Sequence, residues 1–328
     1  MTKRRVLGLL LILSLSYPGM SWAMLFSDIV VLGDSLSDQR NVSLITGGFI
    51  PPSEYTDGTN SGRFTNGLNY IDYLAPSLGL TSTPSLLAGN NYAYGGARTD
   101  SHPLDGLGAL SLLEQRDAFV GSLGGGTADA GALYIAWAGN NDLRDIIVSI
   151  IDPVIPDLNP DVEIPRIAAN VADVVGSLAA LGAKNLLVPR IPDIGLVPII
   201  TGGGPPVPQA SALAFAYDLA LDSVLSTVLD PFSEINLIRF DTFAFLNEIV
   251  AAGPFANTTD ACYSLFVESG GTICADPDQF LFWDGFHPTT AAHEVLAKEL
   301  RVAVPEPTTL ALLGLGLVGL GFARRRLH

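Results

Sequence analysis

The stretch Val30-Val31-Leu32-Gly33-Asp34-Ser35-Leu36-Ser37-Asp38 leads a short apolar run directly into a polar turn that contains a serine. An uninterrupted apolar run of this length is typical of a strand that is buried on both faces. Three further runs of the same kind follow along the chain, at Leu133 to Trp137, Leu186 to Pro189 and Ile235 to Phe240. Apolar residues at helical spacing lie between them. This alternation predicts an α/β domain with a parallel sheet covered on both faces.

Two apolar stripes with steps of three and four residues predict long helices. The first stripe comprises Ile167, Val171, Val174, Leu178 and Leu181, and Gly182 follows it as the expected C-terminal cap. The second stripe comprises Leu213, Tyr217, Ala220, Val224 and Val228. We expect both stripes to face the core. The Gly- and Pro-rich segments 46–62, 121–131 and 201–208 predict surface loops, of which the first and third could rim a substrate cleft.

The composition suits a folded domain with a sizeable core. The chain has 328 residues, of which 48% are hydrophobic and 15% are charged, and this balance excludes a disordered tether. Its formal net charge is -16. Because nucleic-acid binding requires a basic face, the charge argues against a nucleic-acid partner.

The N-terminus has the pattern of a secretory signal peptide. Lys3 to Arg5 supply the positive charges, Val6 to Leu15 the apolar segment, and Ser21-Trp22-Ala23 a small-x-small cleavage site. We expect cleavage after Ala23. The alternative is an uncleaved anchor helix, against which the short apolar segment and Pro18-Gly19 argue.

The C-terminus carries Pro305-Glu306-Pro307, then an apolar run from Leu310 to Ala323, then Arg324 to Arg326. As a helix the apolar run would rise only about 21 Å, less than the roughly 30 Å of a hydrocarbon core. The order of the three parts resembles the PEP-CTERM sorting signal of Gram-negative bacteria. That resemblance implies recognition by an exosortase, transient retention in the inner membrane, and then delivery to the cell surface or secretion. The alternative is a permanent tail anchor.

Cys262 and Cys274 are the two cysteines of the chain. Export permits a disulfide, and the small loop it would close is worth roughly 2–3 kcal/mol in the chain-entropy model. Two cysteines without nearby histidines make a poor zinc site. We therefore expect the two cysteines to form a disulfide.

A nucleophilic serine needs a base, and the chain has four histidines. His328 lies in the expected sorting signal, we expect His293 at the surface of a helix, and His102 has no carboxylate at a spacing that would orient it. His287 differs, because Asp284 precedes it by three residues. At that spacing the carboxylate can hold one imidazole nitrogen and leave the other for the serine. The alternative role of Asp284 is to cap the following helix.

Four short blocks resemble those of the GDSL (SGNH) hydrolase family, in the family's order. They are Gly33-Asp34-Ser35-Leu36, Asn91-Tyr92-Ala93-Tyr94-Gly95-Gly96-Ala97, Gly139-Asn140-Asn141-Asp142 and Asp284-x-x-His287. The G-x-S-x-G motif is absent from the sequence, which excludes the ordinary α/β-hydrolase class. The resemblance covers nearly all of residues 28–300. It implies a flavodoxin-like three-layer α/β/α sandwich with a parallel sheet, the SGNH hydrolase fold.

The same resemblance implies a role for each member of the site. Ser35 would be the nucleophile, His287 its base, and Asp284 the residue that orients the base. The oxyanion would be held by two backbone N–H groups and one side-chain amide, those of Ser35, Gly96 and Asn141. Gly95 is the alternative to Gly96. Neither a metal nor an organic cofactor is implied.

We therefore expect an exported serine esterase or lipase with a signal peptide (1–23), a hydrolase domain (24–303) and a sorting signal (304–328). Its partners would be an ester substrate (a lipid, a small ester or an acylated polysaccharide) and the signal peptidase and exosortase that process it. One alternative is a carbohydrate esterase that removes acetyl groups from extracellular polysaccharide. Another is a non-catalytic surface or matrix protein on the same scaffold, against which the complete set of site residues argues.

Overall fold

A computed structural model of the chain describes residues 26–151, 158–204, 206–264 and 271–304. These residues all belong to one compact unit, Phe26–Glu306. The expected signal peptide, and the Pro-Glu-Pro, apolar and basic parts of the expected sorting signal, lie outside the described residues.

The core of the unit is a parallel sheet of four strands in the order β1 (Ile29–Gly33), β2 (Leu133–Trp137), β3 (Asn185–Leu187) and β4 (Asn236–Ile238). All four predicted strands are confirmed, although β3 and β4 are shorter than the apolar runs. Pro189 explains part of this difference. The flanking residues Val188 and Arg190 still donate to carbonyls of the β4 side, but proline has no N–H with which to continue the ladder.

The segment 90–94 extends the sheet beyond β1. The Val31 N–H donates to the Asn90 carbonyl at 3.0 Å, and the Tyr92 N–H donates to the Val31 carbonyl at 2.7 Å. Segment 90–94 therefore lies beside β1 at one edge of the sheet, and β2, β3 and β4 follow on the opposite side of β1. This is the strand order of a flavodoxin-like doubly wound sheet, and it confirms the predicted fold class.

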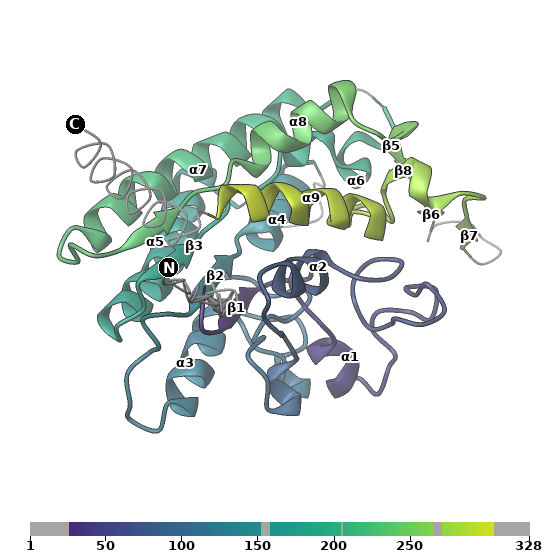
Figure 1. The fold of residues 1–328 in the computed structure, drawn as a ribbon. Coiled ribbons are helices and arrows are strands. Elements are labelled where there is room, and N and C mark those ends of the chain that lie inside the picture. Colours follow the sequence, from purple (N-terminus) through teal and green to yellow (C-terminus); the bar gives the residue numbers. More distant parts are fainter. Residues whose placement is uncertain (1–25, 152–157, 205, 265–270, 305–328) are drawn as a thin grey trace, which may run out of the picture. The chain divides into compact units, whose positions relative to one another are not determined.

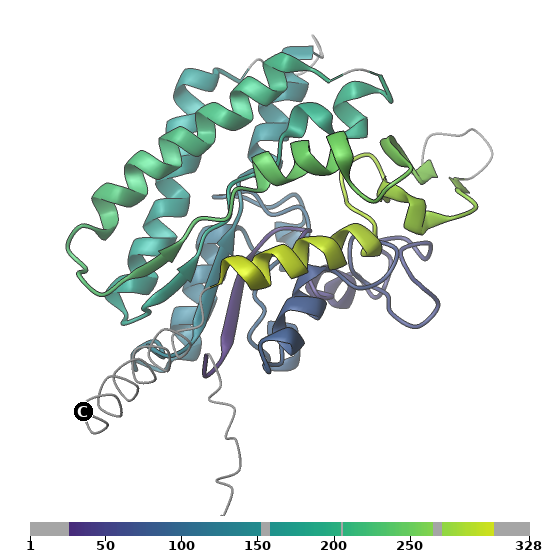
Figure 2. The ribbon, with the colours of Figure 1, turned by 45° about the horizontal axis from the view of Figure 1, so that its top comes forward.

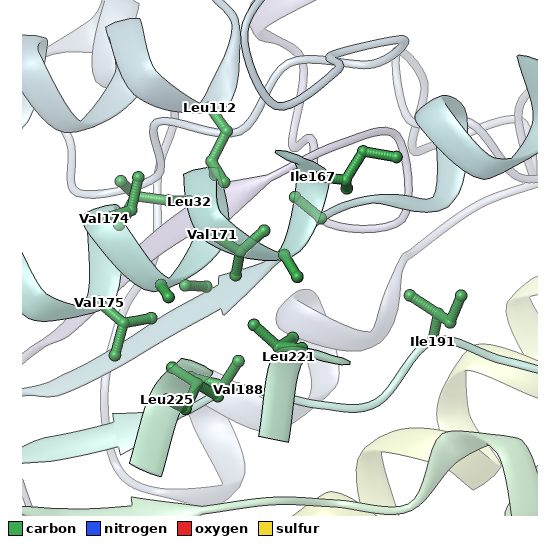
Figure 3. Packing of buried hydrophobic residues seen from close by; sticks show 14 of the residues in the cluster. Leu32, Leu112, Ile167, Val171, Val174, Val175, Val188, Ile191, Leu221 and Leu225 are labelled. Carbon is green, nitrogen blue, oxygen red and sulfur yellow. The ribbon is translucent and has the colours of Figure 1, made fainter. Parts of the chain in front are cut away.

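Helices cover both faces of the sheet (Figures 1 and 2). One face carries α3 (Leu112–Ser122), α4 (Asn140–Ile151), α5 (Pro160–Ala180) and α7 (Pro208–Leu229). The other carries α2 (Tyr70–Ser77), α8 (Thr242–Ala252) and α9 (Thr290–Ala303). Alternate strand residues point to opposite faces, so that Leu32 meets Leu112 of α3 and Val171 of α5 in the first layer, as Figure 3 shows.

The sequence accounts for the ends and the buried faces of several helices. Ser111 and Glu114 form a capping box at the start of α3. After α5, Gly182 has φ +109° and donates to the Ala179 carbonyl, as predicted for a glycine C-cap. The stripe predicted for α7 faces the core as expected. Tyr217 is buried, and Leu213, Ala220, Val224 and Val228 are half-buried and pack against the buried cluster. The most buried residues of the helix form a neighbouring set, Ala210, Ala214, Leu221 and Leu225.

The remaining elements are short. They are α1 (Asn41–Ile45), α6 (Pro198–Thr201), the 3-10 turns η1 (Ser85–Leu87), η2 (Asp105–Leu107), η3 (Ile194–Leu196) and η4 (Pro277–Gln279), and the pairs β5 (Asn257–Ala261) with β8 (Phe280–Phe282) and β6 (Tyr263–Ser264) with β7 (Thr272–Ile273). Cys262 and Cys274 are joined by a disulfide beside β6 and β7.

One described helix, α7, is long and apolar enough to cross a membrane. Its buried residues pack against α5 and the sheet. Core helices of this kind meet the same criterion of length and composition, so α7 is explained by the fold alone.

Candidate active site

Ser35 lies at the carboxyl end of β1, where sites collect in open α/β sheets. After the strand the chain makes one tight turn, in which the N–H groups of Ser37 and Asp38 donate to the Asp34 carbonyl at 3.1 and 3.0 Å. The turn directs the Ser35 hydroxyl toward His287, and the distance from Ser35 Oγ to His287 Nε2 is 2.9 Å. Residues 252 positions apart in the sequence thus come into hydrogen-bond contact.

The segment from Asp284 to His287 connects β8 to α9 and forms a closed turn. Asp284 Oδ1 accepts the backbone N–H groups of Phe286 and His287 at 2.7 and 2.8 Å. Asp284 Oδ2 lies 2.7 Å from His287 Nδ1. Because a carboxylate only accepts, Nδ1 carries the proton and Nε2 is the acceptor for the Ser35 hydroxyl. The structure therefore brings the predicted Ser35, His287 and Asp284 together in one hydrogen-bonded chain.

The buried Asp284 is held in its charged form. Burial acts to raise the pKa of Asp284, but the facing His287 and the hydrogen bonds from His287, Tyr55 and the Phe286 N–H outweigh it and lower this pKa below its usual value. The carboxylate is thus ionised wherever the serine chemistry would operate, and it can stabilise an imidazolium.

Tyr55 is a residue of this site that the sequence analysis missed. Its hydroxyl donates to Asp284 Oδ2 at 2.6 Å, on the same oxygen that His287 uses. The Tyr55 ring is buried and lies edge-on to Tyr263 and Trp283, with ring centroids 5.8 and 5.9 Å away. Burial and the Asp284 charge raise the pKa of Tyr55, so its hydroxyl stays protonated as a donor. Tyr55 lies in the 46–62 loop, far from Asp284 in the sequence, and no local pattern marks it.

Two backbone N–H groups beside Ser35 are available to an oxyanion. Among the described residues, the N–H groups of Ser35 and Gly96 have no hydrogen-bond acceptor. The Gly95 N–H, by contrast, donates to Asp38 Oδ2 at 2.9 Å. Gly96 has φ +87°, a backbone conformation that favours glycine. The contacts therefore favour Gly96 over Gly95 as the donor.

Gly95 and His102 hold the Gly96 peptide in place. A Cβ on Gly95 would lie 1.9 Å from the ring of Phe64, so only glycine fits there. His102 Nδ1 accepts the Leu104 N–H at 2.9 Å, which leaves Nε2 to donate to the Gly95 carbonyl at 2.9 Å. That carbonyl and the Gly96 N–H belong to the same peptide plane. The sequence analysis set His102 aside as a base and did not predict this contact.

Asn141 and Asn140 begin α4 at the end of β2. Asn141 Nδ2 donates to the Ala97 carbonyl at 3.0 Å, which fixes the side chain and leaves its second amide hydrogen for a ligand. Asn140 Nδ2 donates instead to Asp34 Oδ2 at 2.8 Å. The two neighbouring side-chain amides thus have different hydrogen-bond partners. Asn141 lies with Ser35 in the wall of a pocket.

His293 was expected at the surface, and this prediction is wrong. The side chain is 1% exposed and stacks on Tyr70, with ring centroids 6.3 Å apart. Burial lowers its pKa to about 3, so the imidazole is neutral. The error arose because α2 packs against α9. The pattern of charged residues along α9 does not indicate this contact.

A pocket of about 120 Å³ opens beside Ser35 and His287. Its polar lining residues are Asp34, Ser35, Asn140, Asn141, Arg144, Thr242 and His287, and the rest of the lining is apolar. In the part of the chain that the structure describes, no cluster of three or more His, Cys, Asp or Glu side chains is placed to hold a metal ion.

Comparison with known proteins finds two family models that match this chain. The GDSL-like Lipase/Acylhydrolase family model matches residues 29–300, and the PEP-CTERM protein-sorting motif matches residues 303–326. A GDSL esterase/lipase of Arabidopsis thaliana is 25% identical, over 84% of this chain and 90% of its own length. Lipase 1 of Photorhabdus luminescens is 24% identical, over 92% of this chain and 54% of its own length.

Solved structures to which this chain is similar include an acetylxylan esterase from Geobacillus stearothermophilus, with a TM-score of 0.45 and 14% identity over 84% of this chain and 93% of that one. Phospholipase A1 from Streptomyces albidoflavus has a TM-score of 0.37 and 15% identity, over 84% and 98% of the two chains. The PEP-CTERM motif indicates export and membrane-associated sorting in a Gram-negative bacterium. The chain belongs to the GDSL-like lipase/acylhydrolase family, as a hydrolase of carboxylic esters that carries a PEP-CTERM sorting motif.

Proposed function

We propose that the chain cleaves carboxylic esters by acyl transfer to Ser35, with His287 as general base and Asp284 as the residue that orients it. The observation that carries this proposal is the position of His287, whose two ring nitrogens contact Asp284 at 2.7 Å and Ser35 at 2.9 Å. This arrangement is what activation of a serine hydroxyl requires. It favours an enzyme over a non-catalytic protein on the same scaffold.

The reaction proceeds in two steps. In the first, Ser35 Oγ attacks the ester carbonyl while His287 Nε2 takes its proton, and the protonated His287 then gives that proton to the departing alcohol. In the second, His287 takes a proton from water, the resulting hydroxide attacks the acyl-enzyme, and the proton returns to Ser35 as the acid leaves. Asp284 stays ionised throughout and stabilises the imidazolium.

The charge that develops on the carbonyl oxygen is held by three donors in this proposal. They are the N–H groups of Ser35 and Gly96 and the side-chain amide of Asn141. Each has a hydrogen available, and His102 and the Ala97 carbonyl fix two of them before the substrate arrives. Preorganised donors of this kind stabilise the transition state without reorganisation.

The two ends of the chain imply processing in this proposal. Signal peptidase would cut after Ala23 and an exosortase near Pro305-Glu306-Pro307, which would leave the hydrolase domain of residues 24–303. Intact-mass measurement of the protein recovered from the cell surface or the medium tests both cuts. A recovered chain that retains residues 310–326 would contradict release and support a permanent anchor.

The test of the catalytic proposal is a panel of p-nitrophenyl esters, from acetate to decanoate, with wild type and Ser35→Ala measured side by side. We expect hydrolysis by the wild type and a rate near background for Ser35→Ala. Thermal unfolding of both proteins shows whether the substitution leaves the fold intact. Full activity in Ser35→Ala, or no hydrolysis of any ester by the folded wild type, would refute the proposal.

A further inference from the structure

The pocket beside Ser35 has two long walls, one from each of two helices. On α8 the lining residues are Thr242, Phe245, Leu246 and Ile249, and on α9 they are Ala292, Val295 and Leu296. These spacings place each set on one face of its helix. The α8 set extends along roughly 10 Å of helix axis and the α9 set along about 6 Å. The two helices lie side by side on the same face of the sheet (Figures 1 and 2).

We propose that this pocket is an acyl channel, which accepts an unbranched acyl chain of about four to six carbons. The inference rests on the proposed function and names its substrate class: esters of short- to medium-chain fatty acids. It is distinct from the removal of acetyl groups, because an acetyl group has a single methyl with which to fill the channel.

The lining combines the reactive groups with a largely apolar surface. Ser35, Asn141 and His287 line the pocket where an ester group would react, and the other polar lining residues are Asp34, Asn140, Arg144 and Thr242. The rest of the lining is apolar and includes Leu281 and Phe255, which belong to the same apolar cluster as Leu246 of α8 and Ala292 of α9. Such walls offer a carbohydrate few hydrogen-bond partners, but they shield a hydrocarbon chain from water.

The acyl group, not the alcohol, suits this channel for a kinetic reason. The acyl group stays on Ser35 through both steps, whereas the alcohol leaves and water must take its place. An apolar channel holds the part that stays and opposes the entry of water.

The volume sets the length of the chain. An apolar cavity of ~150 Å³ lined by Leu, Ile and Phe holds benzene, which has six carbons. The pocket of about 120 Å³ therefore holds about five carbons. Each methylene that enters the channel increases the apparent specificity about fourfold, until the channel is full.

The experiment uses variants that change the width of the channel. Ala292→Leu narrows it from α9, Ile249→Ala widens it from α8, and Ala291→Leu is the matched control. Ala291 is the neighbouring residue on α9, half-buried and outside the pocket lining. The measurement is kcat/KM for p-nitrophenyl esters from acetate to decanoate, with unfolding temperature as a check on folding.

We expect the wild type to prefer butyrate and hexanoate over acetate by at least tenfold and to decline beyond octanoate. Ala292→Leu lowers the ratio of hexanoate to acetate at least tenfold, Ile249→Ala moves the optimum to longer chains, and Ala291→Leu leaves the profile unchanged. A wild type confined to acetate, or variants whose profiles match the wild type, would overturn the channel and leave the esterase intact. If Ala292→Leu does not fold, Ile249→Ala alone decides.

A second measurement separates the channel from the catalytic chemistry. In Ser35→Ala, thermal shift with butyrate, hexanoate and dodecanoate reads the pocket without any reaction. We expect hexanoate to raise the unfolding temperature most, and Ala292→Leu in the same background to abolish the shift. If hexanoate raised the unfolding temperature of Ser35→Ala and of Ser35→Ala/Ala292→Leu by the same amount, the channel would be overturned. Ester hydrolysis by Ser35→Ala would refute only the proposed mechanism.

Discussion

Replacing Tyr55 by phenylalanine removes a single hydroxyl group from Asp284 and keeps the aromatic ring. The ring contacts with Tyr263 and Trp283, at 5.8 and 5.9 Å, remain. Asp284 has four donors in the structure, at 2.6 to 2.8 Å, and the Tyr55 hydroxyl is the shortest of them. The substitution therefore tests one hydrogen bond to a buried charge.

The expected effect follows from that bond. Because the hydroxyl holds Asp284 Oδ2 in place against His287 Nδ1, its loss loosens the orientation of the base, and a loss of about 1.4 kcal/mol of transition-state stabilisation lowers the rate roughly tenfold. We expect kcat to fall about tenfold in Tyr55→Phe, with KM within twofold of the wild type. The hydroxyl also helps to keep the pKa of Asp284 low. Without it the pKa of Asp284 rises, so the acidic limb of kcat/KM moves to higher pH, while the looser orientation of His287 lowers kcat.

The assay is hydrolysis of p-nitrophenyl butyrate from pH 5 to pH 9. Tyr134→Phe is the matched control, because the Tyr134 hydroxyl donates to the Asp129 carbonyl at 3.0 Å, at the opposite end of β2 from the site. It should cost some stability and leave the pH profile unchanged. A Tyr55→Phe variant whose kcat and acidic limb match those of Tyr134→Phe would show that Tyr55 only supports the fold.

Three further outcomes are expected. Asn141→Ala should lower kcat about 10²- to 10³-fold with little change in KM, because one oxyanion donor is lost; steady-state kinetics that show less than a threefold loss would exclude Asn141 from that role. His102→Leu should lower kcat more than His102→Gln, which keeps a donor for the Gly95 carbonyl, and equal rates in the two variants would contradict a positioning role. Burial raises the pKa of Asp218 to about 7, so the folded protein keeps a proton that the unfolded chain loses near pH 4. The contribution of Asp218 to the free energy of unfolding therefore falls as the pH rises from about 4 to about 7. Thermal melts across that window should show a flatter pH dependence for Asp218→Asn, and an unchanged slope would refute the assignment.

The parts of the fold that the sequence predicted are those with a local signal. Central parallel strands are buried on both faces, so β1 and β2 appear as continuous apolar runs. Ser35 and the segment from Asp284 to His287 each belong to a short motif that can be identified within a few residues. The family resemblance predicted that the two motifs lie together in one site. The buried face of α7 was harder to predict, because its apolar residues surround much of the helix and several stripes fit the spacing.

The remainder of the site depends on contacts between distant segments. Tyr55 lies 229 residues from Asp284, and His102 acts through a peptide carbonyl that has no side-chain signal. The burial of His293 depends on α2 packing against α9, which the pattern of one helix does not show. The proposed acyl channel depends on the volume between α8 and α9, and this volume cannot be derived from the residue types alone.

Titration with a phosphorylating ester, diethyl p-nitrophenyl phosphate, tests most directly whether Ser35 is the nucleophile. The purified protein should release one equivalent of p-nitrophenol for each chain as its esterase activity is lost. Mass spectrometry should then place the diethyl phosphate on the peptide that contains Ser35, and His287→Ala should be labelled far more slowly. A modification at any other residue, or loss of activity without modification of Ser35, would contradict the account.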